Sequence, residues 1–174
     1  MQRAVGMEEL MNVKRWLMTW VAGALLMLGC SGGAPGEAAS AEVLERLGES
    51  YYLVHGDSSF QVYAFRDPHC PACSDLVEAV EDGATPNVEW RWVPVGFLGE
   101  RSREDAAAQI EQEHDVDGEQ AVAKNMEIAQ ALGVRSVPTV FYQDPEGQVR
   151  YFVGGEQQAL EALDRMAADE DEGD

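Results

Sequence analysis

From residue 51 onward, short runs of aliphatic, β-branched and aromatic residues recur along the chain and predict β-strands. Clusters of Gly, Pro, Asp and Ser separate several of these runs. The predicted strands cover 51–54, 60–65, 88–97, 139–143 and 148–153. Turn clusters lie between the first two strands and between the last two, so each of these pairs predicts a hairpin.

Other stretches place apolar residues three and four positions apart, which is the period of an amphipathic helix. The predicted helices cover 41–48, 70–80, 119–132 and 156–168. The stretch 103–115 has only a weak apolar face, and we expect a helical insertion over about 100–132. From residue 51 the order strand-strand-helix-strand-helix-helix-strand-strand-helix predicts an α/β domain over 42–168, in which helices cover both faces of a mixed central sheet.

The first part of the chain has the pattern of an export signal. Lys14 and Arg15 precede the apolar stretch 16–29, which is shorter than the ~20 residues that a membrane-spanning helix needs. Met11 is a more natural start than Met1, because a complete basic region follows it directly.

The apolar stretch ends in Leu-Met-Leu-Gly and then Cys30, which resembles the lipobox of bacterial lipoprotein signal peptides, although Met27 replaces the usual leucine. The resemblance implies a signal peptide over 1–29 and an acylated Cys30 that begins a flexible linker over 30–41. Because no Asp follows Cys30, it also implies anchoring to the outer membrane, on the periplasmic side of the cell envelope. Ordinary cleavage after Ala24, or a buried helix with an incidental cysteine, are the alternatives.

The charge balance excludes several classes of partner. The 174 residues carry 12 Lys and Arg against 32 Asp and Glu, a formal net charge of −20. This acidity argues against nucleic-acid binding and against electrostatic docking on anionic lipid, so we expect membrane contact through the lipid anchor alone. Hydrophobic residues make up 45% of the chain, which supports a packed core. The acidic run 169–174 predicts a disordered, solvated tail.

Two cysteines, Cys70 and Cys73, flank Pro71 and Ala72 at the predicted start of the second helix. Thiols at this spacing can close and reopen a disulfide, and the end of the helix favours the thiolate of the first one. We expect Cys70 to be the exposed nucleophile, and a buried Cys73 to resolve the mixed disulfide. Such chemistry needs no cofactor besides the redox-active Cys70–Cys73 disulfide.

A static disulfide or half of a zinc site are the alternative interpretations of the cysteine pair. Zinc normally takes four ligands, and beyond the acids only His55, His69 and His114 could complete a site, so we predict no metal. Two neighbours are candidates for tuning the thiolate. Pro71 fits the first helical turn and removes an N–H donor. His69, if protonated, would stabilise the Cys70 thiolate, the alternative being an exposed loop histidine.

The stretches 62–73, 92–99 and 133–142 resemble the thioredoxin superfamily, and more narrowly the catalytic domain of the bacterial DsbC/DsbG-type periplasmic disulfide proteins. The resemblance implies a thioredoxin fold, a cis peptide bond between Val137 and Pro138, and backbone groups at Val137 that pair with a substrate strand. It also implies a protein thiol–disulfide oxidoreductase. Such an enzyme acts on cysteine-containing proteins or peptides and exchanges electrons with a DsbD-like or DsbB-like membrane partner.

The chain departs from that family at three points. Residues 30–50 are too few to form the separate dimerisation domain of DsbC and DsbG, so only a catalytic domain is expected. The cysteines enclose Pro-Ala, unlike the best-known members. Ala64 stands where thioredoxin has a buried aspartate, so no carboxylate proton shuttle is expected at that position. We expect Asp67 to serve as a turn or cap residue.

The sequence leaves the direction of exchange open. The resemblance favours a reductase or isomerase, but a few kcal/mol in the relative stability of the two redox forms is enough to make an oxidase that works in the DsbA-like direction. A non-catalytic thioredoxin-fold chaperone or metallochaperone is a further alternative. The polar stretch 100–118 is expected over the active-site side, where it would shape substrate choice, or else forms a solvated face. Trp90 and Trp92 are expected to serve in packing.

Overall fold

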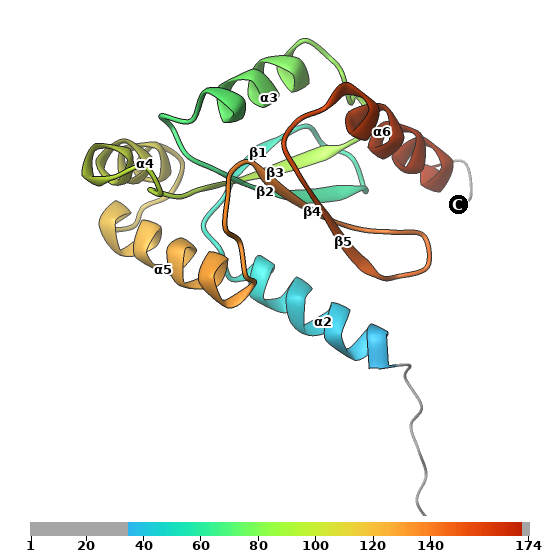
Figure 1. Ribbon diagram of the computed structural model, residues 1–174, viewed down its shortest axis with the longest axis horizontal. Helices are drawn as coiled ribbons and strands as arrows, with labels where there is room; N and C mark the ends of the chain where they lie inside the picture. Colours follow the sequence, from blue (N-terminus) through green and yellow to red (C-terminus); the bar gives the residue numbers. More distant parts are fainter. Residues whose placement is uncertain (1–34, 172–174) are drawn as a thin grey trace, which may run out of the picture. The chain divides into compact units, whose positions relative to one another are not determined.

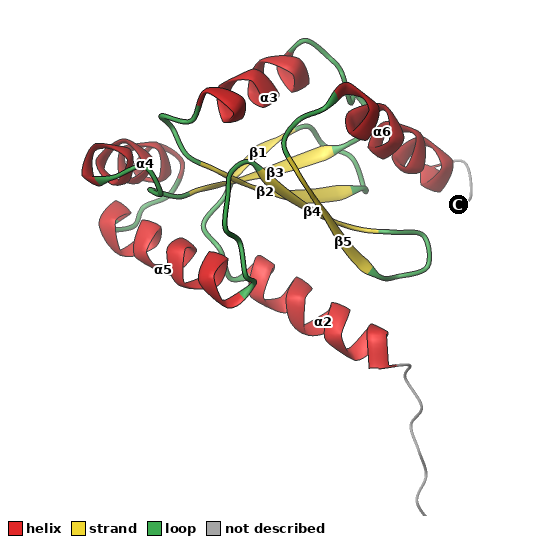
Figure 2. Cartoon of the chain, in the orientation of Figure 1, coloured by secondary structure: helices red, strands yellow, loops and turns green. Residues whose placement is uncertain are grey.

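The computed structural model describes residues 35–171, in which a five-stranded sheet lies between helices (Figures 1 and 2). The strands are β1 (Leu53–His55), β2 (Gln61–Arg66), β3 (Glu89–Pro94), β4 (Thr139–Gln143) and β5 (Val149–Val153). The helices are α2 (Pro35–Gly48), α3 (Pro71–Glu81), α4 (Glu100–Glu113), α5 (Gly118–Ala131) and α6 (Gln157–Asp171).

The strands lie in the order β1-β3-β2-β4-β5. Strands β2 and β3 are parallel, whereas the other neighbouring pairs are antiparallel. Strand β2 is therefore central, and its residues 62–65 are buried because helices cover both of its faces. The prediction of a mixed sheet with helices on both faces is confirmed, and the strand that leads to Cys70 is the most enclosed one.

Two hydrophobic clusters hold the helices on the sheet. Helices α3 and α6 cover one face and α2 and α5 cover the other, while α4 lies at the end of the sheet (Figure 1). The cluster beneath α3 and α6 contains Trp90 and Trp92, whose rings stack 4.8 Å apart, so both residues serve in packing as expected. Helix α4 packs mainly on α5, through small side chains and Ile110.

The predicted hairpin between 51–54 and 60–65 is wrong. Strand β1 pairs antiparallel with β3 and not with β2, with Leu53 opposite Trp92. Strand β2 has a partner on each side, β3 and β4, so no edge is left for β1. The short, exposed β1 instead forms one end of the sheet.

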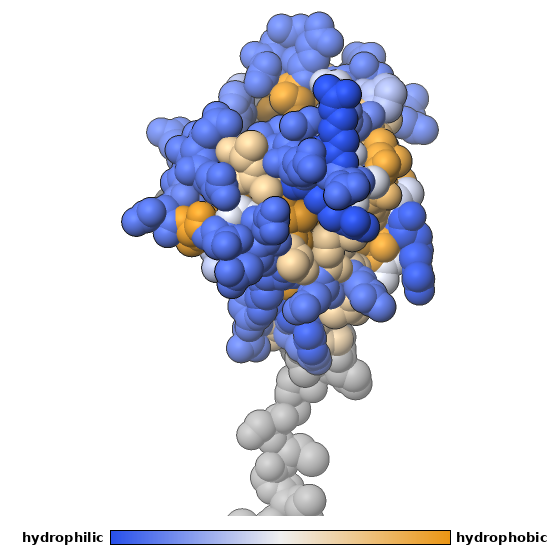
Figure 3. All heavy atoms as spheres, turned by 90° about the vertical axis from the view of Figure 1, so that its left-hand side faces the viewer, coloured by the Kyte–Doolittle hydropathy of each residue, from blue (hydrophilic) through white to orange (hydrophobic). Residues whose placement is uncertain are grey.

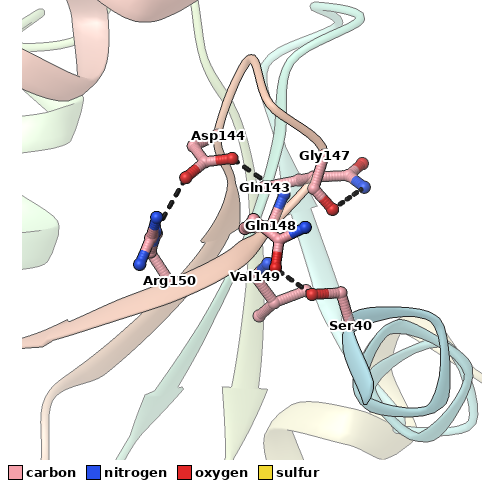
Figure 4. Close-up of polar contacts among 7 residues, drawn as sticks. All are labelled: Ser40, Gln143, Asp144, Gly147, Gln148, Val149 and Arg150. Carbon is pink, nitrogen blue, oxygen red and sulfur yellow. Dashed lines mark hydrogen bonds and ion pairs between the residues drawn. The ribbon is translucent and has the colours of Figure 1, made fainter. Parts of the chain in front are cut away.

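The predicted hairpin at 139–153 is confirmed, and its turn is held by side chains (Figure 4). The Asp144 carboxylate accepts hydrogen bonds from Gln148 N at 2.7 Å and from Arg150 Nε at 2.7 Å. Arg150, which donates the second bond, holds the pKa of Asp144 below its usual range. Val149 N donates to Ser40 Oγ at 3.0 Å, which ties α2 to the edge strand β5.

Two segments expected to be irregular are helical. Helix α2 begins at Pro35, inside the predicted linker 30–41, because proline fits a first helical turn and an Ala-rich run follows it. Helix α6 continues to Asp171, so the prediction of a disordered tail is wrong for residues 169–171. Of the helices in residues 35–171, none is long and apolar enough to cross a membrane. The predicted signal peptide and Cys30 lie outside the described residues.

Candidate active site

The two cysteines lie at the start of α3, on the loop that leaves the central strand β2. Cys70 is the N-cap residue, with no side-chain hydrogen bond at the cap, and Pro71 occupies the first turn. Cys70 N donates to Asp67 O at 3.1 Å, which turns the chain from the strand into the helix. The sulfur of Cys70 thus lies at the end of the helix where N–H groups have no intrahelical partner.

Both cysteines are free thiols, and Cys70 is less exposed than expected. The exposed fraction is 9% for Cys70 and 2% for Cys73. The pKa of the Cys73 thiol is raised to about 12, mainly by burial and also by the Cys70 side chain, while a hydrogen bond from the Asp67 backbone acts in the opposite direction. Cys73 is therefore a protonated, enclosed thiol behind Cys70, as expected, whereas the prediction of an exposed Cys70 is wrong because the loop before β4 lies against its sulfur.

The loop before β4 meets the cysteines from the other side. The Val137–Pro138 peptide bond is cis, as the resemblance implied. The Cys70 Sγ lies 3.5 Å from the Val137 carbonyl oxygen, although the two residues are far apart in the sequence. Pro138 O accepts a hydrogen bond from Gly154 N at 2.9 Å, so the loop is tied to the segment that follows β5.

A buried carboxylate joins the cysteine loop to the loop after β3. Asp67 is 1% exposed, and its two oxygens accept hydrogen bonds from His69 N at 2.8 Å and Leu98 N at 2.9 Å. The turn role expected for Asp67 is confirmed by the bond to His69. The link to Leu98 was missed, because it joins segments that only the folded sheet brings together.

A polar helix flanks the cysteine loop on the remaining side. His69 Nε2 lies 2.6 Å from Asp105 Oδ2 of α4, and both side chains are substantially exposed. Figure 3 views the molecule from the side of α4, and this face is mainly hydrophilic. Residues 100–113 therefore lie next to the active-site loop, as expected for the polar stretch, and His69 is an exposed loop histidine with an acidic partner.

Two further predictions concern groups near the thiols. Ala64 is fully buried in β2, so no carboxylate occupies that position. Within residues 35–171, no cluster of three or more His, Cys, Asp or Glu side chains is arranged to hold a metal ion. Two thiols beside a backbone carbonyl can exchange with a disulfide.

Comparisons with known proteins agree with the fold. A family model for the thioredoxin-like domain matches residues 49–168. The thiol:disulfide interchange protein DsbG of Pseudomonas aeruginosa is 25% identical over 142 residues, which are 67% of this chain and 56% of that protein. The chain thus spans little more than half the length of this curated relative.

Solved structures show the same fold at low sequence identity. A periplasmic thioredoxin-like protein from Salmonella enterica serovar Typhimurium superimposes with a TM-score of 0.59 at 18% identity, covering 72% of this chain and 95% of that one. The catalytic domain of ScsC from Proteus mirabilis gives 0.57 at 18% identity, covering 75% and 97%. The family model matches residues 49–168, which are more than half of the chain, and the paired thiols lie beside a cis-proline loop. The chain therefore belongs to the thioredoxin-like domain family.

Proposed function

We propose that this protein is a thiol–disulfide oxidoreductase that exchanges disulfides with cysteine-containing proteins through Cys70 and Cys73. One observation carries the proposal. Cys70 lies at the N-terminus of α3 with its sulfur 3.5 Å from the Val137 carbonyl oxygen, and the more deeply buried Cys73 lies one turn behind it. The name of DsbG, a thiol:disulfide interchange protein, supports the same class of chemistry.

The proposed reaction needs only the two sulfurs. In the reductive direction the Cys70 thiolate attacks a substrate disulfide, forms a mixed disulfide and releases one substrate thiolate, which takes up a proton. Cys73 then loses its proton and attacks the Cys70 sulfur, which releases the second substrate thiol. The substrate disulfide gains two electrons and the Cys70–Cys73 dithiol is oxidised to a disulfide. The oxidative direction is the reverse, so no additional cofactor is required.

Apolar surface beside the cis-proline loop supports a polypeptide substrate. Leu98, whose backbone N–H donates to Asp67, has a side chain that is 59% exposed. Tyr151 and Val153 of the edge strand β5 are also exposed, at 67% and 53%. A hollow of about 180 Å³ adjoins the loop and is lined in part by Ser136, Tyr151 and Val153. We infer that a substrate strand pairs with the backbone of Val137, next to Pro138, while its apolar side chains contact Leu98, Tyr151 and Val153.

The location and partners belong to the same proposal. The signal-like segment and Cys30 support export and lipid attachment, with the outer membrane as the proposed site. The Salmonella enterica protein that is named as periplasmic supports the cell envelope as the compartment. A reductase or isomerase would receive electrons from a DsbD-like membrane protein, and an oxidase would deliver them to a DsbB-like one.

We favour the reductase or isomerase direction, because the sequence motifs resemble the DsbC/DsbG type and DsbG of Pseudomonas aeruginosa is 25% identical over 142 residues. Insulin reduction by the wild type, by Cys70→Ala and by the exposed-site control Ser74→Ala tests the exchange itself. We expect the wild type and the control to be active and Cys70→Ala to be inactive. A wild type that binds unfolded protein without any exchange would instead indicate a chaperone or metallochaperone.

The reduction potential of the cysteine pair, measured by equilibration with glutathione, tests the direction. A potential of about −230 mV or lower would support a reductase. A potential of about −120 to −150 mV, at the strongly oxidising end, would make the protein a disulfide donor and overturn the favoured direction.

A further inference from the structure

Helices α4 and α5 pack side by side and leave a groove between them. Gly118 at the start of α5 allows the close approach, because a Cβ there would lie 2.5 Å from Ala107 O of α4. Gly118 N also donates to Glu111 Oε1 at 2.9 Å, which ties the two helices together. Buried small side chains and Ile110 fill the contact between them. The walls of the groove are therefore held by packing before any partner binds, which lowers the cost of binding.

The groove has a volume of about 520 Å³ and an apolar floor, which α5 supplies through Val122, Ala123 and Met126. Val122 is buried, Met126 is half-buried and Ala123 is exposed. In Figure 3, which faces α4, apolar surface is visible between the hydrophilic side chains. A volume of this order is typical of clefts that bind ligands, so the floor can bury apolar side chains of a partner.

The rim of the groove is acidic. Three exposed glutamates line it, Glu100 and Glu104 from α4 and Glu119 from α5, and Arg103 is the one cation in the lining. Three carboxylates against one guanidinium leave the lining with a charge of −2. The ion pairs found within residues 35–171 involve none of these four side chains. The free carboxylates favour a partner that brings Lys or Arg side chains.

The groove adjoins the cysteine loop through α4. Asp105 of this helix contacts His69, the residue before Cys70. Glu100, which lines the groove, follows two residues after Leu98, whose exposed side chain belongs to the apolar surface proposed for the substrate. A polypeptide that is held at Cys70 and Leu98 can therefore continue along α4 into the groove.

We propose that the groove between α4 and α5 binds a basic amphipathic segment of the protein substrate. Its apolar side chains fill the floor, and its Lys or Arg side chains pair with the glutamates of the rim. The inference rests on the proposed function, because the segment belongs to the polypeptide whose disulfide is exchanged. A second copy of this chain is a poor occupant, since 32 Asp and Glu against 12 Lys and Arg would bring like charge to the rim.

Fluorescence anisotropy tests the groove with a labelled, cysteine-free peptide of Lys, Leu and Ala, and the same peptide with Glu in place of Lys is the control ligand. On the full chain with Cys30→Ser, we expect the Lys peptide to bind at least about tenfold more tightly in ~0.1 M salt. Ala123→Arg places a cation and a long side chain on the floor and should weaken this binding about tenfold. Ala131→Arg makes the same change at the exposed end of α5, outside the groove, and should weaken it less than about threefold. Equal binding by these two variants would overturn the proposal.

The rim is tested by removing its charges. Glu104→Gln with Glu119→Gln should weaken binding of the Lys peptide about fivefold, as the loss of two exposed ion pairs implies. Glu161→Gln with Glu170→Gln removes two charges from exposed positions of α6 and should have a smaller effect. An equal loss in the two double variants would show that only the net charge of the chain matters, and would overturn a site at the rim.

Peptides that contain one disulfide and carry either the Lys or the Glu segment connect the groove to exchange. The wild type should reduce the Lys peptide with the lower KM. Ala123→Arg should raise this KM towards that of the Glu peptide, whereas Ala131→Arg should keep the preference. Equal KM values in the wild type would overturn the substrate as the occupant. A wild type that reduces neither peptide nor insulin would overturn the proposed function, whereas insulin reduction without binding of the Lys peptide would overturn this inference alone.

Discussion

Removal of the Asp67 carboxylate is the perturbation whose effect follows most directly from the contacts. The side chain is 1% exposed and accepts hydrogen bonds from the backbone N–H groups of His69 and Leu98. Asp67→Ala leaves both N–H groups, whose bonds are partly buried, without their carboxylate partner, at a cost of about 1–3 kcal/mol each. We therefore expect a loss of about 3 kcal/mol in the free energy of unfolding, or roughly 6–12 °C in Tm for a chain of this size. In Asp67→Asn one bond can persist, so the loss should be smaller.

Urea denaturation of the reduced protein measures these differences, with Asp105→Ala as the matched control. Asp105 is also an acidic residue that contacts His69, but its side chain is half exposed. An exposed pair of this kind contributes less than about 1 kcal/mol. If Asp67→Ala were no more destabilising than Asp105→Ala, the buried carboxylate would not hold the two loops together and the reasoning would fail.

Three other predictions test separate parts of the structure. Because burial raises the pKa of Cys73 to about 12, the stability of the reduced protein should fall as pH rises from about 9 towards 12, by at most about 1.4 kcal/mol per pH unit, and this part should vanish in Cys73→Ala. Asn125 is fully buried and bonds the Tyr51 backbone and the Pro94 carbonyl, so Asn125→Leu should cost about 2–4 kcal/mol in urea denaturation. A Cβ on Gly118 would lie 2.5 Å from Ala107 O, so Gly118→Ala should cost about 1–3 kcal/mol, whereas Gly48→Ala, which meets no atom, should cost nothing.

The sequence predicted what depends on local pattern. The helix that carries the cysteines, helix α5 and the last hairpin have strong periodicity or turn chemistry, and each was found close to its expected bounds. The cysteine spacing and Val137–Pro138 located the chemistry, because both are short motifs. The N-terminal limit of α2 was missed, because its first residues are small and carry no apolar period.

The remaining features depend on contacts between distant segments. Strand β1 was assigned to the wrong partner because two adjacent strands favour a hairpin, and only the double pairing of β2 excludes it. Asp67 was recognised as a turn residue, but its bond to Leu98 depends on where β3 ends.

The measurement that tests the central claim most directly is covalent trapping of a substrate on Cys70. Cys73→Ala cannot resolve a mixed disulfide. When this variant, which also carries Cys30→Ser, is reduced and incubated with a disulfide-containing protein, it should yield a stable complex that mass spectrometry maps to Cys70. Cys70→Ala should yield none, because the remaining thiol is buried and protonated. A complex that forms on Cys73 in Cys70→Ala, or no complex in Cys73→Ala, would contradict the account.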